Sequence, residues 1–283
     1  MLKQRVITAM VLLAILLPAL FASSPLPFTL LVLVMVAAGA WEWGRLNGFG
    51  QAASVATAGV CMALCGLAWQ QGWVARDLRL LWLAAGVAWV LGSVALIRLG
   101  VPGWAQIPRA VRWAGGVLAL WLAWLAVAQA RAIGVNFLLS IMALVWAADI
   151  CAYFAGRRFG LKFTRNKLAP AISPGKSWEG VWGGVAGVLL LALVWVFLDR
   201  HFAASVPSFY SQLARAGWPL LIVAAVFMAA MSVVGDLIES LIKRSAGAKD
   251  SSNLLPGHGG VLDRIDALLP TLPLAMMLTT LVY

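Results

Sequence analysis

Residues 216–237, AGWPLLIVAAVFMAAMSVVGDL, decide the fold class, because this stretch of 22 residues carries a single charge, that of Asp236. A helix that crosses the hydrocarbon core of a bilayer needs about 20 mainly apolar residues. A charge at the centre of a bilayer costs on the order of 2.5–3.5 kcal/mol on insertion scales, so a carboxylate in a membrane helix usually has a partner or a role. The stretch therefore predicts a membrane helix that carries Asp236 near its end.

The same apolar pattern recurs along the chain, which has 283 residues, of which 63% are hydrophobic and 11% charged. A soluble domain is about half apolar and about a quarter charged. We expect an all-α, polytopic integral membrane helical bundle, built as one unit. Residues 1–131 would hold the first five spans, and residues 132–283 would hold four spans and two polar loops. The nine predicted spans are roughly 6–22, 26–41, 52–69, 78–97, 115–130, 134–155, 179–198, 216–237 and 261–283.

The first predicted span has two interpretations. Lys3 and Arg5 precede an apolar run from Val6 to Ala22, which is also the layout of a cleaved signal peptide. The run is long for a signal peptide and another apolar run follows almost at once. We therefore expect a retained span.

The distribution of basic residues predicts how the chain is oriented. With the N-terminus inside, 16 of the 21 Lys and Arg residues fall on the cytoplasmic side. The other five are Arg76, Arg79, Arg131, Arg200 and Arg215. Cytoplasmic loops are enriched in basic residues, so we expect both polar loops to face the cytoplasm. The net charge of +11 fits this bias and attraction to anionic lipid, and we expect no nucleic-acid partner.

The second polar loop, SLIKRSAGAKDSSNLLPGHGGVLDRID at 240–266, concentrates charge: seven of its 27 residues are charged. Asp263 and Asp266 are three residues apart and share a helical face. Together with Asp236, carboxylates from two helix ends could hold Mg²⁺, which prefers oxygen ligands and often shares them with substrate phosphates. Two other interpretations stay open: a favourable interaction with the helix dipole, and ion pairs with Arg264 or Lys243.

Basic and glycine residues in this loop could bind phosphate. Lys243, Arg244 and Lys249 precede several glycines, which let backbone N–H groups approach an anion closely. Lys243 could instead form a helical ion pair with Glu239, and Arg244 could contact lipid headgroups. His258 lies between glycines and could donate to a phosphate, carry a proton or cap the last helix.

The first polar loop, from Asp149 to Gly180, contains the segment SPGKSWEG. It places Ser173 and Lys176 just before a predicted helix, where phosphate is bound readily. The glycine spacing of a Walker A motif is absent. The basic segments GRRFG and RNK in the same loop could equally bind anionic lipid headgroups.

Residues 240–266 resemble the signature of the phosphatidate cytidylyltransferases, also called CDP-diacylglycerol synthases. The segments GDLIES, DICAYFAGRRFG and SPGKSWEG are similar to that family too, so the resemblance covers most of residues 145–270. The matching positions of the signature are Ser240, Lys243, Arg244, Lys249, Asp250, Pro256, His258, Gly259, Gly260, Asp263, Arg264 and Asp266.

The resemblance implies a metal-dependent nucleotidyltransferase of phospholipid biosynthesis, with residues 132–283 as its catalytic region. Asp236 and Asp263 would be the ligands of Mg²⁺, with a second cation possible. The catalytic group would consist of Asp236, Lys243, Arg244, His258, Asp263 and Asp266. Substrate would be bound by Ser173, Lys176, Ser240, Lys249, Asp250, Gly259, Gly260 and Arg264.

The implied partners are CTP, phosphatidic acid and the membrane lipid, and a homodimer is one possible assembly. The implied location is the cytoplasmic membrane of a bacterium. A CDP-alcohol phosphotransferase is an alternative, but its paired-aspartate pattern is missing from the sequence. An anion transporter is another alternative, but it would carry charges along its spans at midplane depth.

Overall fold

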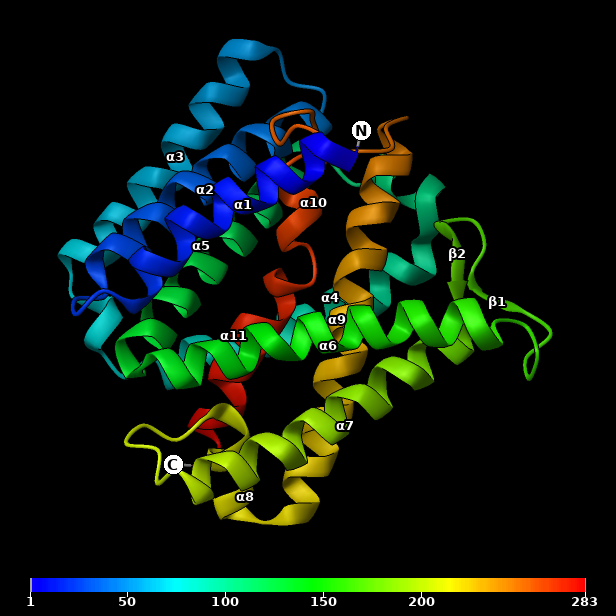
Figure 1. Cartoon of the computed structure of the whole chain (residues 1–283). Coiled ribbons are helices and arrows are strands. Elements are labelled where there is room, and N and C mark those ends of the chain that lie inside the picture. Colours follow the sequence, from blue (N-terminus) through cyan, green and yellow to red (C-terminus); the bar gives the residue numbers. More distant parts are fainter. Residues whose placement is uncertain (1, 283) are drawn as a thin grey trace.

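The computed structural model describes residues 2–282, without the side chains of Leu2, Lys3 and Arg5. The orientation prediction uses Lys3 and Arg5, whose side chains thus lie outside the described part. The described chain is helical apart from loops and one hairpin (Figure 1). Its elements are α1 (Leu2–Phe21), α2 (Leu26–Leu46), α3 (Gln51–Gln70), the 3₁₀ turn η1 (Trp73–Ala75), α4 (Arg79–Gln106), α5 (Arg109–Ile133), α6 (Val135–Phe159), β1 (Lys167–Ala169), β2 (Ser173–Ser177), α7 (Trp178–His201), α8 (Phe209–Ala216), α9 (Trp218–Ser245), α10 (Leu262–Ile265) and α11 (Leu268–Thr280).

The all-α membrane fold is confirmed. Within residues 2–282, seven helices, α2 to α7 and α9, are long and apolar enough to cross a membrane. Large apolar side chains are exposed along these helices, among them Leu91, Leu190 and Phe197. Such a surface would be a liability in water but is normal against lipid tails.

Close helix packing brings the two polar loops together. Helices α6 and α7 lie side by side, and α9 packs against α7 and α6 (Figure 1). Gly183 and Gly187 of α7 face Ala155 and Cys151 of α6, and a Cβ at either glycine would collide with them. Small residues spaced four apart allow membrane helices to approach closely. On the other side, α9 and α11 pack against α4, and α11 also against α5.

The predicted spans agree with helices in position, but several helices are longer than predicted. Helix α2 continues past residue 41 to Leu46, and α5 already begins at Arg109. The second predicted span ends at residue 41, just before Glu42. Glu42 is buried and hydrogen-bonded, so the helix continues through it. Helix α4 bends sharply at Gly100, which has φ +65° and precedes Pro102.

The ninth predicted span is not one continuous helix. Residues 262–280 form the short α10 and the 13-residue α11, which are joined at Asp266 and Ala267. Neither is among the seven helices of spanning length, so the count of nine spans stays a prediction. The segment SPGKS was predicted as a loop but forms β2, paired antiparallel with β1. Ser177 then caps α7 by accepting a hydrogen bond from the N–H of Gly180.

Candidate active site

The C-terminal half of α9 carries the first polar contact of the site. This contact joins the first polar loop to Asp236, just before the second polar loop. Asp236 Oδ2 lies 2.6 Å from Lys176 Nζ, at the end of β2. The Ser240 hydroxyl donates to Asp236 Oδ1 over 3.2 Å, one helical turn further along α9. The Asp236 and Lys176 side chains keep 34% and 23% of their surface exposed, so the pair is accessible. Three of the predicted site residues therefore meet at one place.

The next turn of α9 carries a buried ammonium group between two carboxylates. Lys243 Nζ lies 2.6 Å from Asp263 Oδ1 and also forms an ion pair with Glu239. These three side chains expose between 4% and 12% of their surface. Removing one partner of such a buried pair costs about 3–5 kcal/mol, because a charge is left uncompensated. The sequence left open whether Lys243 pairs with Glu239 or Asp263, and it pairs with both.

Backbone and hydroxyl donors occupy the second oxygen of Asp263. Asp263 Oδ2 accepts from the N–H of Gly260 at 2.7 Å and from the N–H and hydroxyl of Ser251, both at 2.9 Å. Burial alone would raise the pKa of Asp263, but the hydrogen bonds from Lys243 and Gly260 outweigh it and lower the pKa to about 2. Asp263 is therefore held as a carboxylate in one fixed position.

A further concentration of negative charge lies between α9, α10 and α6. Asp266, just after α10, interacts electrostatically with Asp236 and Asp149. Burial, followed by the negative charge of Asp236, raises the pKa of Asp266 to about 7. Asp149 also interacts with Lys176 and Arg264. Excess negative charge at this place favours a bound cation.

The donor set fits Mg²⁺ in its chemistry, because all candidate ligands are carboxylate oxygens. Both predicted ligands, Asp236 and Asp263, already contact a cation, since each lies 2.6 Å from a lysine ammonium. Among residues 2–282, no group of three or more Asp, Glu, His or Cys side chains is placed to hold a metal. Mg²⁺ usually takes only one or two protein carboxylates and completes its shell with water and phosphates. A shared protein–substrate site is therefore the arrangement that fits.

The remaining predicted residues do not join the hydrogen bonds of this cluster. Arg244 is exposed and donates to the carbonyl of Ala248. His258 is half-buried, and its Nδ1 lacks a hydrogen-bond partner within the described chain. Gly259 has φ +85°, and a Cβ there would crowd Asp263. The others are Lys249, Asp250 and Arg264, which are exposed, and Ser173, which lies half-buried in β2.

Sequence reasoning missed Glu42, which lies in the segment WEWGRL of α2. Its side chain is completely buried, and its two oxygens accept four hydrogen bonds from the 240–266 loop. The signals available were this short segment itself and a lone carboxylate within an otherwise apolar stretch. Such a residue usually has a partner, but its sequence position does not reveal a partner about 210 residues away.

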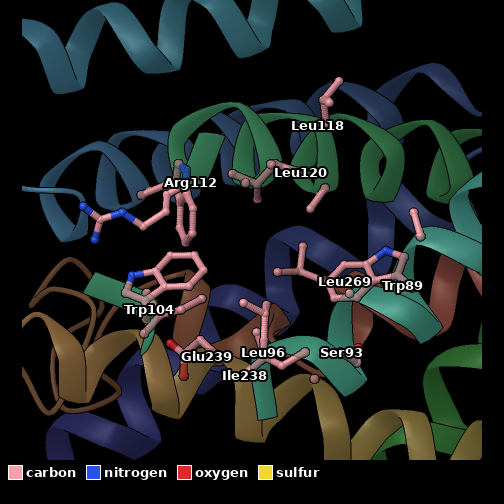
Figure 2. A pocket seen from close by; sticks show the side chains of 18 of the residues that line it. Trp89, Ser93, Leu96, Trp104, Arg112, Leu118, Leu120, Ile238, Glu239 and Leu269 are labelled. Carbon is pink, nitrogen blue, oxygen red and sulfur yellow. The ribbon is translucent and has the colours of Figure 1, made fainter. Parts of the chain in front are cut away.

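An apolar cavity of about 480 Å³ adjoins the polar cluster. Cavities of this size are typical of ligand sites. Its walls come from α2, α4, α5, α9 and α11, and Glu239 and Asp266 are among its polar lining residues. Figure 2 shows Arg112, Trp104 and Glu239 toward one end, with Trp89 and Ser93 toward the other. The cavity thus places an apolar compartment directly beside charged groups.

These features define an integral membrane protein that can bring an anionic head group and apolar chains to one site. The model of the cytidylyltransferase family matches residues 3–282. The chain therefore belongs to this family of nucleotidyltransferases, which confirms the resemblance seen in residues 240–266.

Relatives of known name support the same assignment. The chain is 41% identical over 281 residues to the phosphatidate cytidylyltransferase of Pseudomonas aeruginosa, covering 96% of this chain and 95% of that protein. It is 38% identical over 294 residues to the protein of that name from Haemophilus influenzae, with 96% of each chain covered. A Brucella suis protein of the same name is 42% identical over 135 residues, which cover 48% of this chain and 43% of that protein.

Proposed function

We propose that this protein is a phosphatidate cytidylyltransferase, which converts CTP and phosphatidic acid into CDP-diacylglycerol and pyrophosphate. An oxygen of the lipid phosphate attacks the α-phosphorus of CTP. The bond from that phosphorus to the oxygen bridging the β-phosphate breaks, and pyrophosphate leaves. The observation that carries the proposal is the contact between the apolar cavity and the charged cluster at Glu239 and Asp266.

Positive charge is the main requirement of this reaction, because both substrates are anions. Fixed positive groups that face the developing charge lower the barrier most when they are already in place. Lys176 is held by Asp236 of α9, and Lys243 is held by Glu239 of α9 and Asp263 of α10. Arg244, Lys249 and Arg264 are exposed and would contact the nucleotide phosphates as these arrive.

Asp236 and Asp263 are the residues that would hold Mg²⁺, together with phosphate oxygens of the substrates. The cation, when bound, supplies charge neutralisation between two anionic reactants. Both carboxylates already attract ammonium groups, which supports the assignment. Asp266 and Asp149 contribute negative charge nearby, and a second cation stays a prediction.

The lipid substrate would place an acyl chain in the apolar cavity and its phosphate beside the charged cluster at Glu239 and Asp266. The cavity is lined almost entirely by apolar residues of α4, α5, α9 and α11, such as Leu96, Leu122 and Leu269. Burying a methylene group in such a compartment gains about 0.8 kcal/mol. We further propose a location in a bacterial cytoplasmic membrane with the charged cluster on the cytoplasmic side, where CTP is found. A homodimer stays a prediction.

The test is an assay of purified protein with labelled CTP and phosphatidic acid in mixed micelles. We expect CDP-diacylglycerol and pyrophosphate, with activity lost in EDTA and restored by Mg²⁺. Consumption of CDP-diacylglycerol with an added alcohol, and none of CTP, would instead identify a CDP-alcohol phosphotransferase. CTP turnover in the presence of EDTA would reject the metal assignment alone.

Asp263→Asn is the matching loss-of-function variant, because it keeps size but removes the carboxylate charge. The new amide group would also face Lys243 or the N–H groups of Gly260 and Ser251. We expect kcat to fall about 10²–10³-fold at every Mg²⁺ concentration. Asp77→Asn, at an exposed residue before α4, is the control and should keep wild-type turnover. Activity of Asp263→Asn within about threefold of wild type, roughly 0.6 kcal/mol, would contradict its role.

A further inference from the structure

Glu42 on α2 contacts the charged loop from the other half of the chain. Its Oε1 accepts from the N–H of Val261 at 2.9 Å and from the Ser252 hydroxyl at 2.5 Å. Its Oε2 accepts from the N–H of Leu262 at 2.8 Å and from the Ser251 hydroxyl at 3.1 Å. Each oxygen therefore receives one backbone and one serine donor.

These donors come from the two ends of one loop. Ser251 and Ser252 begin the glycine-containing segment, whereas Val261 and Leu262 end it at the start of α10. Closing a flexible loop has an entropic cost, which is offset only where contacts hold its ends together. The single carboxylate of Glu42 contacts both ends, so it fixes the base of the loop.

The base of this loop in turn positions Asp263. Asp263 directly follows Leu262, and its Oδ2 accepts from Ser251 and Gly260. The Ser251 hydroxyl lies 3.1 Å from Glu42 Oε2 and 2.9 Å from Asp263 Oδ2, so the two carboxylates share its single proton. The packing is tight as well, since a Cβ at Gly260 would collide with Glu42 and Ser251.

We infer that Glu42 is a positioning residue for cytidylyl transfer, which acts by fixing the loop that carries Asp263. The inference rests on the proposed function. A buried carboxylate that only satisfied loop N–H groups would affect stability, whereas a positioning residue also affects the rate of the folded enzyme.

Glu42→Gln is the most informative substitution. An amide has one oxygen and one NH₂ group, so in either orientation the NH₂ faces the backbone N–H of Val261 or Leu262. A serine hydroxyl can rotate to accept a hydrogen bond, but a backbone N–H cannot. We expect faster hydrogen exchange in residues 251–262 and a fall in kcat of about tenfold or more. The KM for CTP should change by less than about threefold, because the exposed phosphate-binding residues remain.

Two further variants complete the experiment. Glu42→Asp keeps both acceptor oxygens on a shorter side chain and should show smaller changes in exchange and kcat. If Glu42→Gln fails to fold, Glu42→Asp is compared with the wild-type protein in its place. Asp199→Asn is the matched control, because Asp199 also accepts from a backbone N–H and a hydroxyl, those of Ser208 and Ser211. It lies at the opposite end of α7 from the site, so exchange should rise near residue 208 while kcat stays unchanged.

Wild-type kcat in Glu42→Gln would overturn the inference, whether or not exchange of the loop increases. Unchanged exchange in 251–262 would overturn it too, because the loop would not depend on Glu42. If the wild-type protein fails to convert CTP, the proposed function is rejected. Exchange would in that case still report separately whether Glu42 fixes the loop.

Discussion

At the scale of single residues, the lysines of the site form structural ion pairs and are also placed for a role in binding phosphate. Lys243 is held by Glu239 and Asp263, so the interpretation of Lys243 as the partner of Glu239 in a helical ion pair is correct. That pairing also fixes Lys243 beside Glu239, which is one of the residues that line the cavity. Lys176 is held in the same way by Asp236. The carboxylates offset part of the cost of burying each ammonium group.

A pair of lysine and arginine substitutions separates binding of nucleotide from binding of lipid headgroups. Lys249 is exposed on the 240–266 loop, whereas Arg109 is exposed at the start of α5, over the Phe49 ring. We expect Lys249→Ala to raise the KM for CTP or lower kcat sharply. Arg109→Ala should leave both nearly unchanged, because a charge near anionic lipid is worth only about 1 kcal/mol of attraction. Steady-state kinetics with varied CTP at fixed phosphatidic acid is the measurement. Equal, small effects would mean that the basic residues of the loop serve membrane orientation.

At the scale of elements, the site depends on how closely α9 approaches the junction of α10 and α11. Gly235 lies there, next to Asp236, and a Cβ would come within 2.6 Å of the Asp266 carbonyl oxygen and 2.8 Å of Pro270. Any side chain at residue 235 would push the two segments apart. The separation between Asp236 and Asp266 would then change.

Gly235→Ala tests this approach, with Gly59→Ala in α3 as its control. Overpacking costs about 1–3 kcal/mol, so we expect Gly235→Ala to lower the midpoint of thermal unfolding in detergent and to reduce turnover. A Cβ at Gly59 would meet no atom within 4 Å. Alanine is favoured over glycine inside a helix by about 0.5–1 kcal/mol, so Gly59→Ala should unfold at or above the wild-type midpoint. Similar midpoints and rates for both variants would show that α9 can move away without consequence.

The sequence predicted the helices and most of the charged cluster, because apolar runs and clustered charge are local signals. Asp236, Lys243 and Asp263 were predicted as site residues, and the structure brings their loops and helices together. Glu42 escaped prediction because its partners are remote in sequence. The hairpin of β1 and β2 escaped because strands of three and five residues, with Pro174 and Gly175 inside, show no alternating pattern.

At the scale of the whole molecule, contacts between remote segments place the helix ends on two opposite faces. On one face, the Thr8 hydroxyl of α1 donates to the carbonyl of Pro256 in the charged loop, and Lys176 meets Asp236. On the other, Arg79 at the start of α4 donates to the carbonyl of Thr280 at the end of α11. Figure 1 shows the start of α1 near α10 and the end of α11 near α8. Both polar loops therefore share the face at which α1 begins.

This arrangement, with the basic residues divided 16 to five, predicts the topology in the membrane. A reporter inserted within residues 161–175 should be cytoplasmic, and one fused after the last residue should be periplasmic. A third reporter, inserted at 203–207 between α7 and α8, should also be periplasmic, because this turn lies at the end of α7 remote from Lys176. Each fusion is measured in intact cells with two reporters. Alkaline phosphatase activity marks a periplasmic position, and green fluorescence marks a cytoplasmic position. Reporters at 161–175 and after the last residue on the same side would rule out a nine-span chain, since three predicted spans, 179–198, 216–237 and 261–283, separate these two positions. A periplasmic reporter at 161–175 would also separate the charged cluster from cytoplasmic CTP and so contradict the proposed function.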